Sequence, residues 1–214
     1  RLARTDLARS GSTGEWDAWV PSGGATFDSQ SYRTTLGEPG SAAGAITVGS
    51  WVSKTTWSAA TGGSYTNGRT VGQYSTFSSL GPTRDGRAKP EIMAPGEVIN
   101  AALSVNEANP SAQRITTGGQ GVANSRIVLQ GTSMASPHIA GLVALLFQKN
   151  PSLTTSQVKD ALFGTNTSAH TVTDSNTSTT GVASEDEVTL SANASGNTGR
   201  PAWNNRWGYG KADG

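Results

Sequence analysis

A serine at the start of an apolar helix is the residue of this chain with the clearest chemical potential. Arg126 to Gln130 is a short β-branched run that favours a strand, and a Gly-Thr turn follows it. The small and apolar run after that turn ends at Lys149 and predicts a buried helix. Ser133 therefore falls in the first helical turn, where free backbone N–H groups and the helix dipole favour negative charge. A serine alkoxide and a developing oxyanion both gain from that environment, so Ser133 is the candidate nucleophile and its N–H a candidate oxyanion donor.

The segment Gly131–Gly141 (GTSMASPHIAG) resembles the nucleophile signature of the subtilisin-like serine proteases, the subtilases. Further stretches share this resemblance, namely Phe77–Thr83, Lys89–Gly96, Trp207–Asp213, and Gly37–Gly40 with the strand Ala45–Gly49 that follows. The resemblance implies a serine endopeptidase that cleaves peptide bonds through an acyl-enzyme on Ser133. It also implies that the substrate contacts four residues: Gly37, Glu38, Pro39 and Thr132.

The partners that would activate the serine are missing. A triad needs a histidine base and an acid that orients it, and in subtilases both precede the serine. The two histidines, His138 and His170, both follow Ser133. His138 lies roughly 140° round the helix axis from the serine at 3.6 residues per turn, and His170 lies in a polar loop. The early aspartates lack the family's Asp-Ser/Thr-Gly context: Asp6, Asp17 and Asp28. No Ala-Gly-Asn segment for the oxyanion hole is present either.

The resemblance implies an α/β class: a subtilisin-like three-layer fold with a mostly parallel sheet and a central buried helix after Ser133. With 214 residues the chain can bury one core, and we expect residues 1–214 to be the C-terminal portion of a catalytic domain whose N-terminal part is absent. Two strand-like runs within residues 1–30 predict a β-hairpin insertion. Residues 165–200, rich in Thr, Ser and Asn, predict a polar surface excursion.

Hydrophobic patterns predict the main elements. Strands are expected at Ala45–Val52, Arg69–Phe77, Glu97–Leu103 and Arg126–Gln130. A second helix should begin at a Thr154-x-x-Gln157 capping box and end at Gly164. In the first helix, close packing on all sides should make three small residues nearly inaccessible: Ala140, Gly141 and Ala144.

The amino-acid composition limits the kinds of molecule that this chain is expected to bind. A net charge of +1 with 14% charged residues gives no footprint for nucleic acid or an anionic membrane. The chain has no cysteine, so it forms neither disulfides nor thiolate metal sites. Abundant Gly, Ser, Thr and Asn are typical of secreted hydrolases, which predicts an extracellular protein. No cofactor is evident. The acids of Ser184–Glu187 suit calcium, although a solvated turn is the favoured interpretation.

Glu38 has two interpretations. A buried carboxylate beside a specificity pocket would favour a lysine or arginine side chain in the substrate. The favoured alternative is a loop glutamate that faces solvent or caps a turn.

Three functions stay open. The first is a serine endopeptidase that receives its His and Asp from an absent N-terminal segment, so that its partners are a protein or peptide substrate and the N-terminal half of the same protease domain. The second is a subtilase used for peptide ligation or cyclisation. The third is a non-catalytic, subtilase-derived binding domain. A carbohydrate-binding sandwich is excluded by the helix after Ser133.

Overall fold

The computed structural model describes residues 18–19, 33–106, 113–115, 125–164, 189–190, 195, 197, 199–200 and 202–212. The chain divides into two compact units, Arg1–Ser31 and Tyr32–Gly214, and every element named below belongs to the second unit. The hairpin expected within residues 1–30 lies outside the described residues, except for residues 18–19, and so does most of the excursion expected at residues 165–200.

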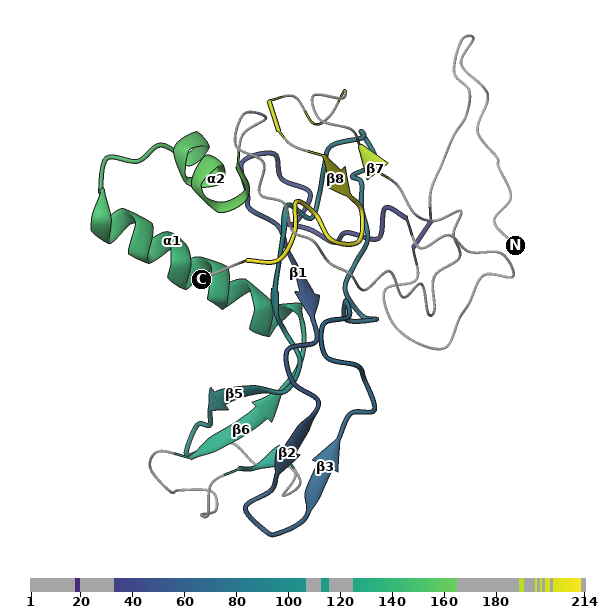
Figure 1. Ribbon diagram of the computed structural model, residues 1–214, viewed down its shortest axis with the longest axis vertical. Helices are drawn as coiled ribbons and strands as arrows, with labels where there is room; N and C mark the ends of the chain where they lie inside the picture. Colours follow the sequence, from purple (N-terminus) through teal and green to yellow (C-terminus); the bar gives the residue numbers. More distant parts are fainter. Residues whose placement is uncertain are drawn as a thin grey trace. The chain divides into compact units, whose positions relative to one another are not determined.

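The second unit combines helices with short strands. In chain order its described elements are β1 (Val48–Trp51), β2 (Thr56–Ser58), β3 (Ser64–Thr66), β4 (Ile92–Pro95), β5 (Ile99–Ala102), β6 (Arg126–Leu129), α1 (Thr132–Lys149), α2 (Thr155–Phe163), β7 (Thr189–Leu190) and β8 (Trp203–Asn204) (Figure 1). Helices occur together with parallel and antiparallel strand pairs, which confirms the α/β class. No described helix has the length and apolarity needed to cross a membrane.

A parallel pair of strands, β1 and β4, forms the centre of the unit. Their register pairs Val48 with Ile92 and Trp51 with Pro95. Helix α1 packs against both strands, and β4 also forms a parallel bridge to Lys211 near the end of the chain. Because β4 is covered on several sides, Ile92, Met93 and Ala94 are all buried, as the apolar run of a covered parallel strand predicts. This pair is the part of the expected parallel sheet that the described residues contain.

The other described strands pair antiparallel, β5 with β6, β2 with β3, and β7 with β8. The hairpin β2–β3 and the antiparallel pair β5–β6 lie at the same end of the unit (Figure 1). A backbone hydrogen bond of 2.8 Å from Ala60 to Arg114 and a bridge between Arg114 and Ile127 connect them. On the β2–β3 hairpin the rings of Trp57 and Tyr65 stack with their centroids 5.8 Å apart.

Three of the four predicted strands are confirmed at their centres, as β1, β5 and β6. The fourth prediction, Arg69–Phe77, is wrong. That segment is a series of turns whose backbone bonds return to β1, including one of 2.8 Å from Ser75 to Ser50. Gly72, with φ of 93°, adopts a left-handed conformation that a regular strand does not contain.

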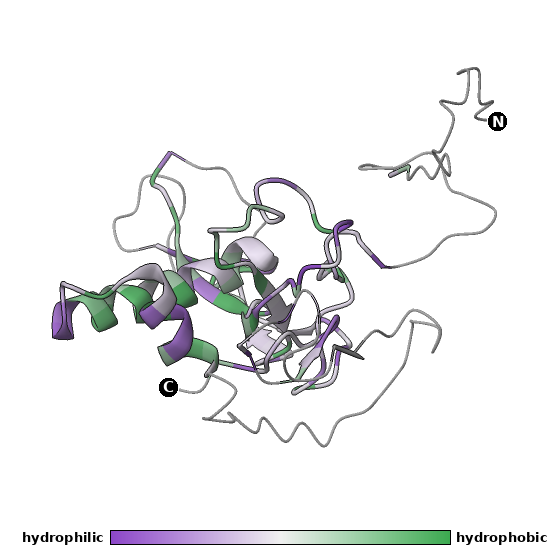
Figure 2. Ribbon diagram, turned by 90° about the horizontal axis from the view of Figure 1, so that it is seen from above, coloured by the Kyte–Doolittle hydropathy of each residue, from purple (hydrophilic) through white to green (hydrophobic). Residues whose placement is uncertain are grey.

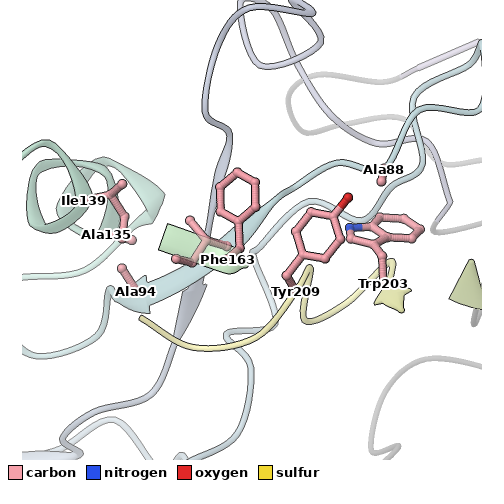
Figure 3. Packing of buried hydrophobic residues seen from close by; sticks show 8 residues of the cluster. Ala88, Ala94, Ala135, Ile139, Phe163, Trp203 and Tyr209 are labelled. Carbon is pink, nitrogen blue, oxygen red and sulfur yellow. The ribbon is translucent and has the colours of Figure 1, made fainter. Parts of the chain in front are cut away.

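Both predicted helices are confirmed. Helix α2 begins at the predicted capping box, in which the Gln157 N–H donates to Thr154 Oγ1 and the Thr154 N–H donates to Gln157 Oε1. Gly164, with φ of 77°, ends the helix. Side chains from both helices, β4 and the C-terminal segment form one buried cluster, comprising Ala88, Ile92, Ala94, Ala135, Ile139, Phe163, Trp203 and Tyr209 (Figure 3).

The burial predicted for α1 is wrong on one face of the helix. Ala135 and Ile139 are buried against the strands, but the three small residues expected to be inaccessible, Ala140, Gly141 and Ala144, are exposed. The physical reason is that no described element covers this face. Apolar residues occur along most of α1 (Figure 2), and the exposed ones include Leu145, which is 61% accessible.

Candidate active site

Ser133 lies at the open end of α1. The helix begins at Thr132, and Ser133 is exposed in its first turn. The N-cap is Gly131, with φ of 145° and ψ of 162°, and no side chain caps the helix there. The first N–H groups of a helix, here including those of Thr132 and Ser133, have no carbonyl partner within the helix. This local geometry favours an anion next to Ser133, as the sequence predicted.

The turn before Ser133 is fixed to the end of β4. The Gly131 N–H donates a hydrogen bond of 2.8 Å to the carbonyl of Gly96, and the Gly96 N–H donates one of 3.1 Å to Trp51 at the end of β1. The space at Gly96 admits only glycine, because a Cβ atom there would lie 2.0 Å from Ser50 Oγ and 2.9 Å from the Gly131 carbonyl oxygen. The candidate nucleophile is therefore held at the carboxyl ends of the parallel strands, where α/β folds usually place their sites.

Ser50, which lies beside Gly96, is hydrogen-bonded to two further buried serines. The hydroxyls of Ser50 and Ser75 lie 2.8 Å apart, and the Ser50 N–H donates to Ser78 Oγ at 3.0 Å. All three are almost inaccessible to solvent. Sequence reasoning noted the run around Ser78 only as a family resemblance and missed this role.

His138 does not reach Ser133. Its Nδ1 atom donates to the carbonyl of Met134, four residues earlier in the same helix, at 2.8 Å. Within the described part of the chain no residue forms a hydrogen bond to Ser133 Oγ. His170, Asp6, Asp17 and Asp28 lie outside the described residues. Helical geometry thus excludes His138 as the base.

The predicted substrate-binding residues lie in two places. Thr132 is half-buried beside Ser133, whereas Gly37, Glu38 and Pro39 form an exposed turn before β1. The Glu38 carboxylate accepts a hydrogen bond from the Ser41 hydroxyl. An exposed carboxylate that caps its own turn agrees with the favoured interpretation of Glu38 and not with a buried acid.

A buried charged network behind this turn went unnoticed in the sequence. Lys89 and Glu91 lie inside the Lys89–Gly96 motif, and their side chains pair at 3.0 Å. Burial lowers the pKa of the Lys89 ammonium below its ordinary value, which the negative charge of Glu91 opposes. Lys159 of α2 joins the same carboxylate at 3.2 Å. The sequence signal was the presence of charged residues within an otherwise apolar motif.

No group of three or more His, Asp or Glu side chains gathers within the described ranges in a way that could hold a metal ion. The acids of Ser184–Glu187 lie outside those ranges.

Comparisons with known proteins identify the family of this chain. The model of the subtilase family matches residues 12–210. The serine protease AprX of Bacillus subtilis is 36% identical over 143 residues, which cover 67% of this chain and 28% of AprX. Subtilisin DY of Bacillus licheniformis is 40% identical over 92 residues, covering 43% of this chain and 25% of that protein. An uncharacterised protein of Aquifex aeolicus is 32% identical over 154 residues, covering 72% of this chain and 61% of that protein.

This chain thus spans less than two thirds of the length of each of these relatives. The family model, however, extends over nearly all of its residues, including Ser133 and the segments that hold it. With its α/β fold and the serine at the open start of α1, the chain belongs to the subtilase family of serine proteases.

Proposed function

We propose that this chain is the nucleophile-bearing portion of a serine endopeptidase, and that a histidine and an aspartate from an N-terminal segment of the same protease domain complete its triad. The observation that carries the proposal is the placement of Ser133, exposed on an uncapped first turn that the Gly131–Gly96 hydrogen bond fixes to the strands. Membership of the subtilase family supports the same reaction.

The reaction follows from this placement. The histidine of the N-terminal segment takes the proton of Ser133 Oγ, and the oxygen attacks the carbonyl carbon of the substrate. The Ser133 N–H, which no helical carbonyl accepts, stabilises the oxyanion as it develops. The amine then leaves with the proton from the histidine, and water hydrolyses the acyl-enzyme. The substrate contacts Thr132 and the turn at Gly37–Pro39.

The uncovered face of α1 supports the proposed partner. Ala140, Gly141 and Ala144 present small side chains that permit close approach of another segment. Leu145 and Phe147 add exposed apolar surface on the same helix. Burying such surface against a further part of the domain would stabilise the assembly by about 25 cal/mol for each Å² removed from water.

Hydrolysis and ligation would use the same acyl-enzyme on Ser133, so analysis of the products of the combined protein distinguishes them. On composition we also propose an extracellular location.

The test is peptide hydrolysis by this chain combined with its N-terminal segment. Ser133→Ala should reduce turnover by something on the order of 10⁶-fold, as loss of a triad serine does. Ser136→Ala, an exposed serine one turn further along α1, is the matched control and should retain full turnover. Equal turnover in the wild type and the Ser133→Ala variant would contradict Ser133 as the nucleophile. A wild type without turnover would favour a non-catalytic binding domain.

A further inference from the structure

The loop at residues 37–45, which carries the predicted substrate turn, is held by side chains that come from outside it. Thr47 Oγ1 donates to the carbonyl of Gly40 at 2.5 Å, and Arg87 Nη1 donates to that of Ser41 at 2.7 Å. Further along, Lys159 Nζ donates to Ala43 at 3.3 Å and to Ala45 at 3.2 Å, and Lys89 Nζ donates to Ala45 at 2.8 Å. Four carbonyls of the loop are thus bound, two of them by Lys159.

Burial cannot fix this loop by itself. Ala42, Ala43 and Gly44 are exposed and carry almost no apolar side chain. Within the described residues the Ala43 carbonyl accepts its hydrogen bond from Lys159 Nζ. Backbone hydrogen bonds from Ala42 to Pro39 (3.0 Å) and from Ala45 to Ala42 (3.2 Å) close turns within the loop. The side-chain donors fix these turns to the rest of the unit, and such hydrogen bonds are stronger when the donor is charged.

Lys159 itself is held firmly. It lies on α2, whose Val158 and Phe163 are buried in the core. Its ammonium also pairs with Glu91 at 3.2 Å, and the second oxygen of Glu91 accepts the Thr47 N–H at 2.7 Å. The lysine thus links a helix of the nucleophile-bearing core to the loop through a short, partly buried connection.

Of the two lysines that pair with Glu91, Lys159 is the one whose substitution should leave the fold intact. The Lys89 side chain is only 3% accessible. Its replacement would remove the more buried of the two cations that pair with the Glu91 carboxylate, and a buried charge without its partner destabilises the fold. The Lys159 side chain is 15% accessible, and methionine would retain its aliphatic stem while Lys89 still pairs with Glu91.

We propose that Lys159 is a positioning residue for the loop at residues 37–45, which carries the proposed substrate turn, and that it thereby contributes to the preference of the enzyme among peptide substrates. This assignment rests on the proposed function of the chain. Lys159 touches neither the nucleophile nor the substrate and acts through the carbonyls of Ala43 and Ala45.

The experiment compares two kinds of reaction at Ser133, in the protein with its N-terminal segment present. Labelling by diisopropyl fluorophosphate needs the nucleophile but not the loop at residues 37–45, whereas peptides that vary at the residue before the cleaved bond need both. The variants are Lys159→Met and Lys159→Arg, with Lys149→Met, an exposed lysine at the end of α1, as the matched control.

We expect Lys159→Met to be labelled at the wild-type rate and to show an unchanged melting temperature to within a few degrees. Its KM for the preferred peptide should rise, and its kcat/KM ratio between preferred and disfavoured peptides should fall by about tenfold or more, the size of one pocket contact. Lys159→Arg should restore much of the ratio, since it keeps a charged donor, and Lys149→Met should equal the wild type.

An unchanged ratio in Lys159→Met, with normal labelling, would overturn the assignment while leaving the proposed function intact. An equal loss for labelling and for every peptide would also overturn it, because this indicates a general structural role. A wild-type protein that is neither labelled nor active would contradict the proposed function, and the assignment with it.

Discussion

The backbone N–H of Gly131 lies 2.8 Å from the carbonyl oxygen of Gly96 and donates a hydrogen bond to it. Gly96 follows the parallel strand β4, and Gly131 follows β6 and starts the turn into α1. The contact therefore joins the end of the central strand pair to the turn that carries Ser133. A small change at either glycine is expected to move the nucleophile, because the first turn of α1 has no side-chain cap of its own.

Gly96→Ala tests this contact. The new Cβ would lie 2.0 Å from Ser50 Oγ and 2.9 Å from the Gly131 carbonyl oxygen, so the turn or the strand must shift. We expect a loss of about 1–3 kcal/mol in the free energy of unfolding, as for other overpacked sites. Urea denaturation of the isolated chain measures it.

Gly141→Ala is the matched control for that substitution. No atom lies within 4 Å of a Cβ at Gly141, which is inside α1. Alanine should therefore stabilise the chain by about 0.5–1 kcal/mol through its higher helix propensity. The same sign for both alanine substitutions would be inconsistent with the close approach of Gly96 to its neighbours.

Ala140→Leu distinguishes an effect on the folding stability of this chain from an effect on its binding to the N-terminal segment. Ala140 is exposed, so leucine should change the free energy of unfolding by no more than about 0.5 kcal/mol. The same change should weaken binding of the N-terminal segment, because close approach to α1 would be blocked. Calorimetric titration measures the binding, and Ser152→Leu, exposed and outside the helix, is the control. Unimpaired binding of Ala140→Leu would place the partner elsewhere.

Thr154→Ala removes the N-cap of α2. The Thr154 hydroxyl accepts the Gln157 N–H at 3.3 Å in the capping box, so its loss should cost about 1 kcal/mol of unfolding free energy. Ser156→Ala, an exposed change within the first turn of the same helix, should be neutral or slightly stabilising. Thermal unfolding followed by circular dichroism distinguishes the two variants. Equal melting temperatures would contradict a stabilising role of the Thr154 N-cap.

Tyr209 makes stability depend on alkaline pH. Burial raises the pKa of its phenol above the ordinary value of 10.0, and the hydroxyl donates to Asn197 Oδ1. Above about pH 10 the unfolded chain loses this proton while the folded chain keeps it, so stability should fall as the pH rises.

Absorbance at 295 nm during alkaline titration should show that Tyr209 ionises only when the chain unfolds, and Tyr209→Phe should lower the amplitude of the step at unfolding by one tyrosine. Ionisation of Tyr209 while the chain is still folded would contradict its burial.

The sequence predicted those features that neighbouring residues determine. The start of α1 follows from the glycine turn before Ser133, and the start of α2 follows from the pairing of Thr154 with Gln157. The hairpin β2–β3 was missed because each of its strands has only three residues, too few for the alternation of polar and aromatic side chains to indicate a strand. The useful signal was its turn, where Gly62 and Gly63 both have φ near 90°.

Features that depend on distant residues could not be predicted. The pairing of Lys159 with Glu91 joins α2 to a motif far earlier in the chain, and nothing local to either residue indicates it. The exposure of Ala140 depends on whether another segment covers α1, and its apolar pattern alone indicates only that a cover would be favourable. The role of Ser50 beside Gly96 likewise appears only in three dimensions.

The most direct test of the account is labelling of Ser133 by a fluorophosphonate probe, followed by mass spectrometry of the modified peptide. A serine without a neighbouring base is a poor nucleophile, and His138 is bonded to its own helix. We predict no labelling of the isolated chain and rapid labelling at Ser133 once the N-terminal segment is added. Rapid labelling of the isolated chain, or none at Ser133 in the combined protein, would contradict the account.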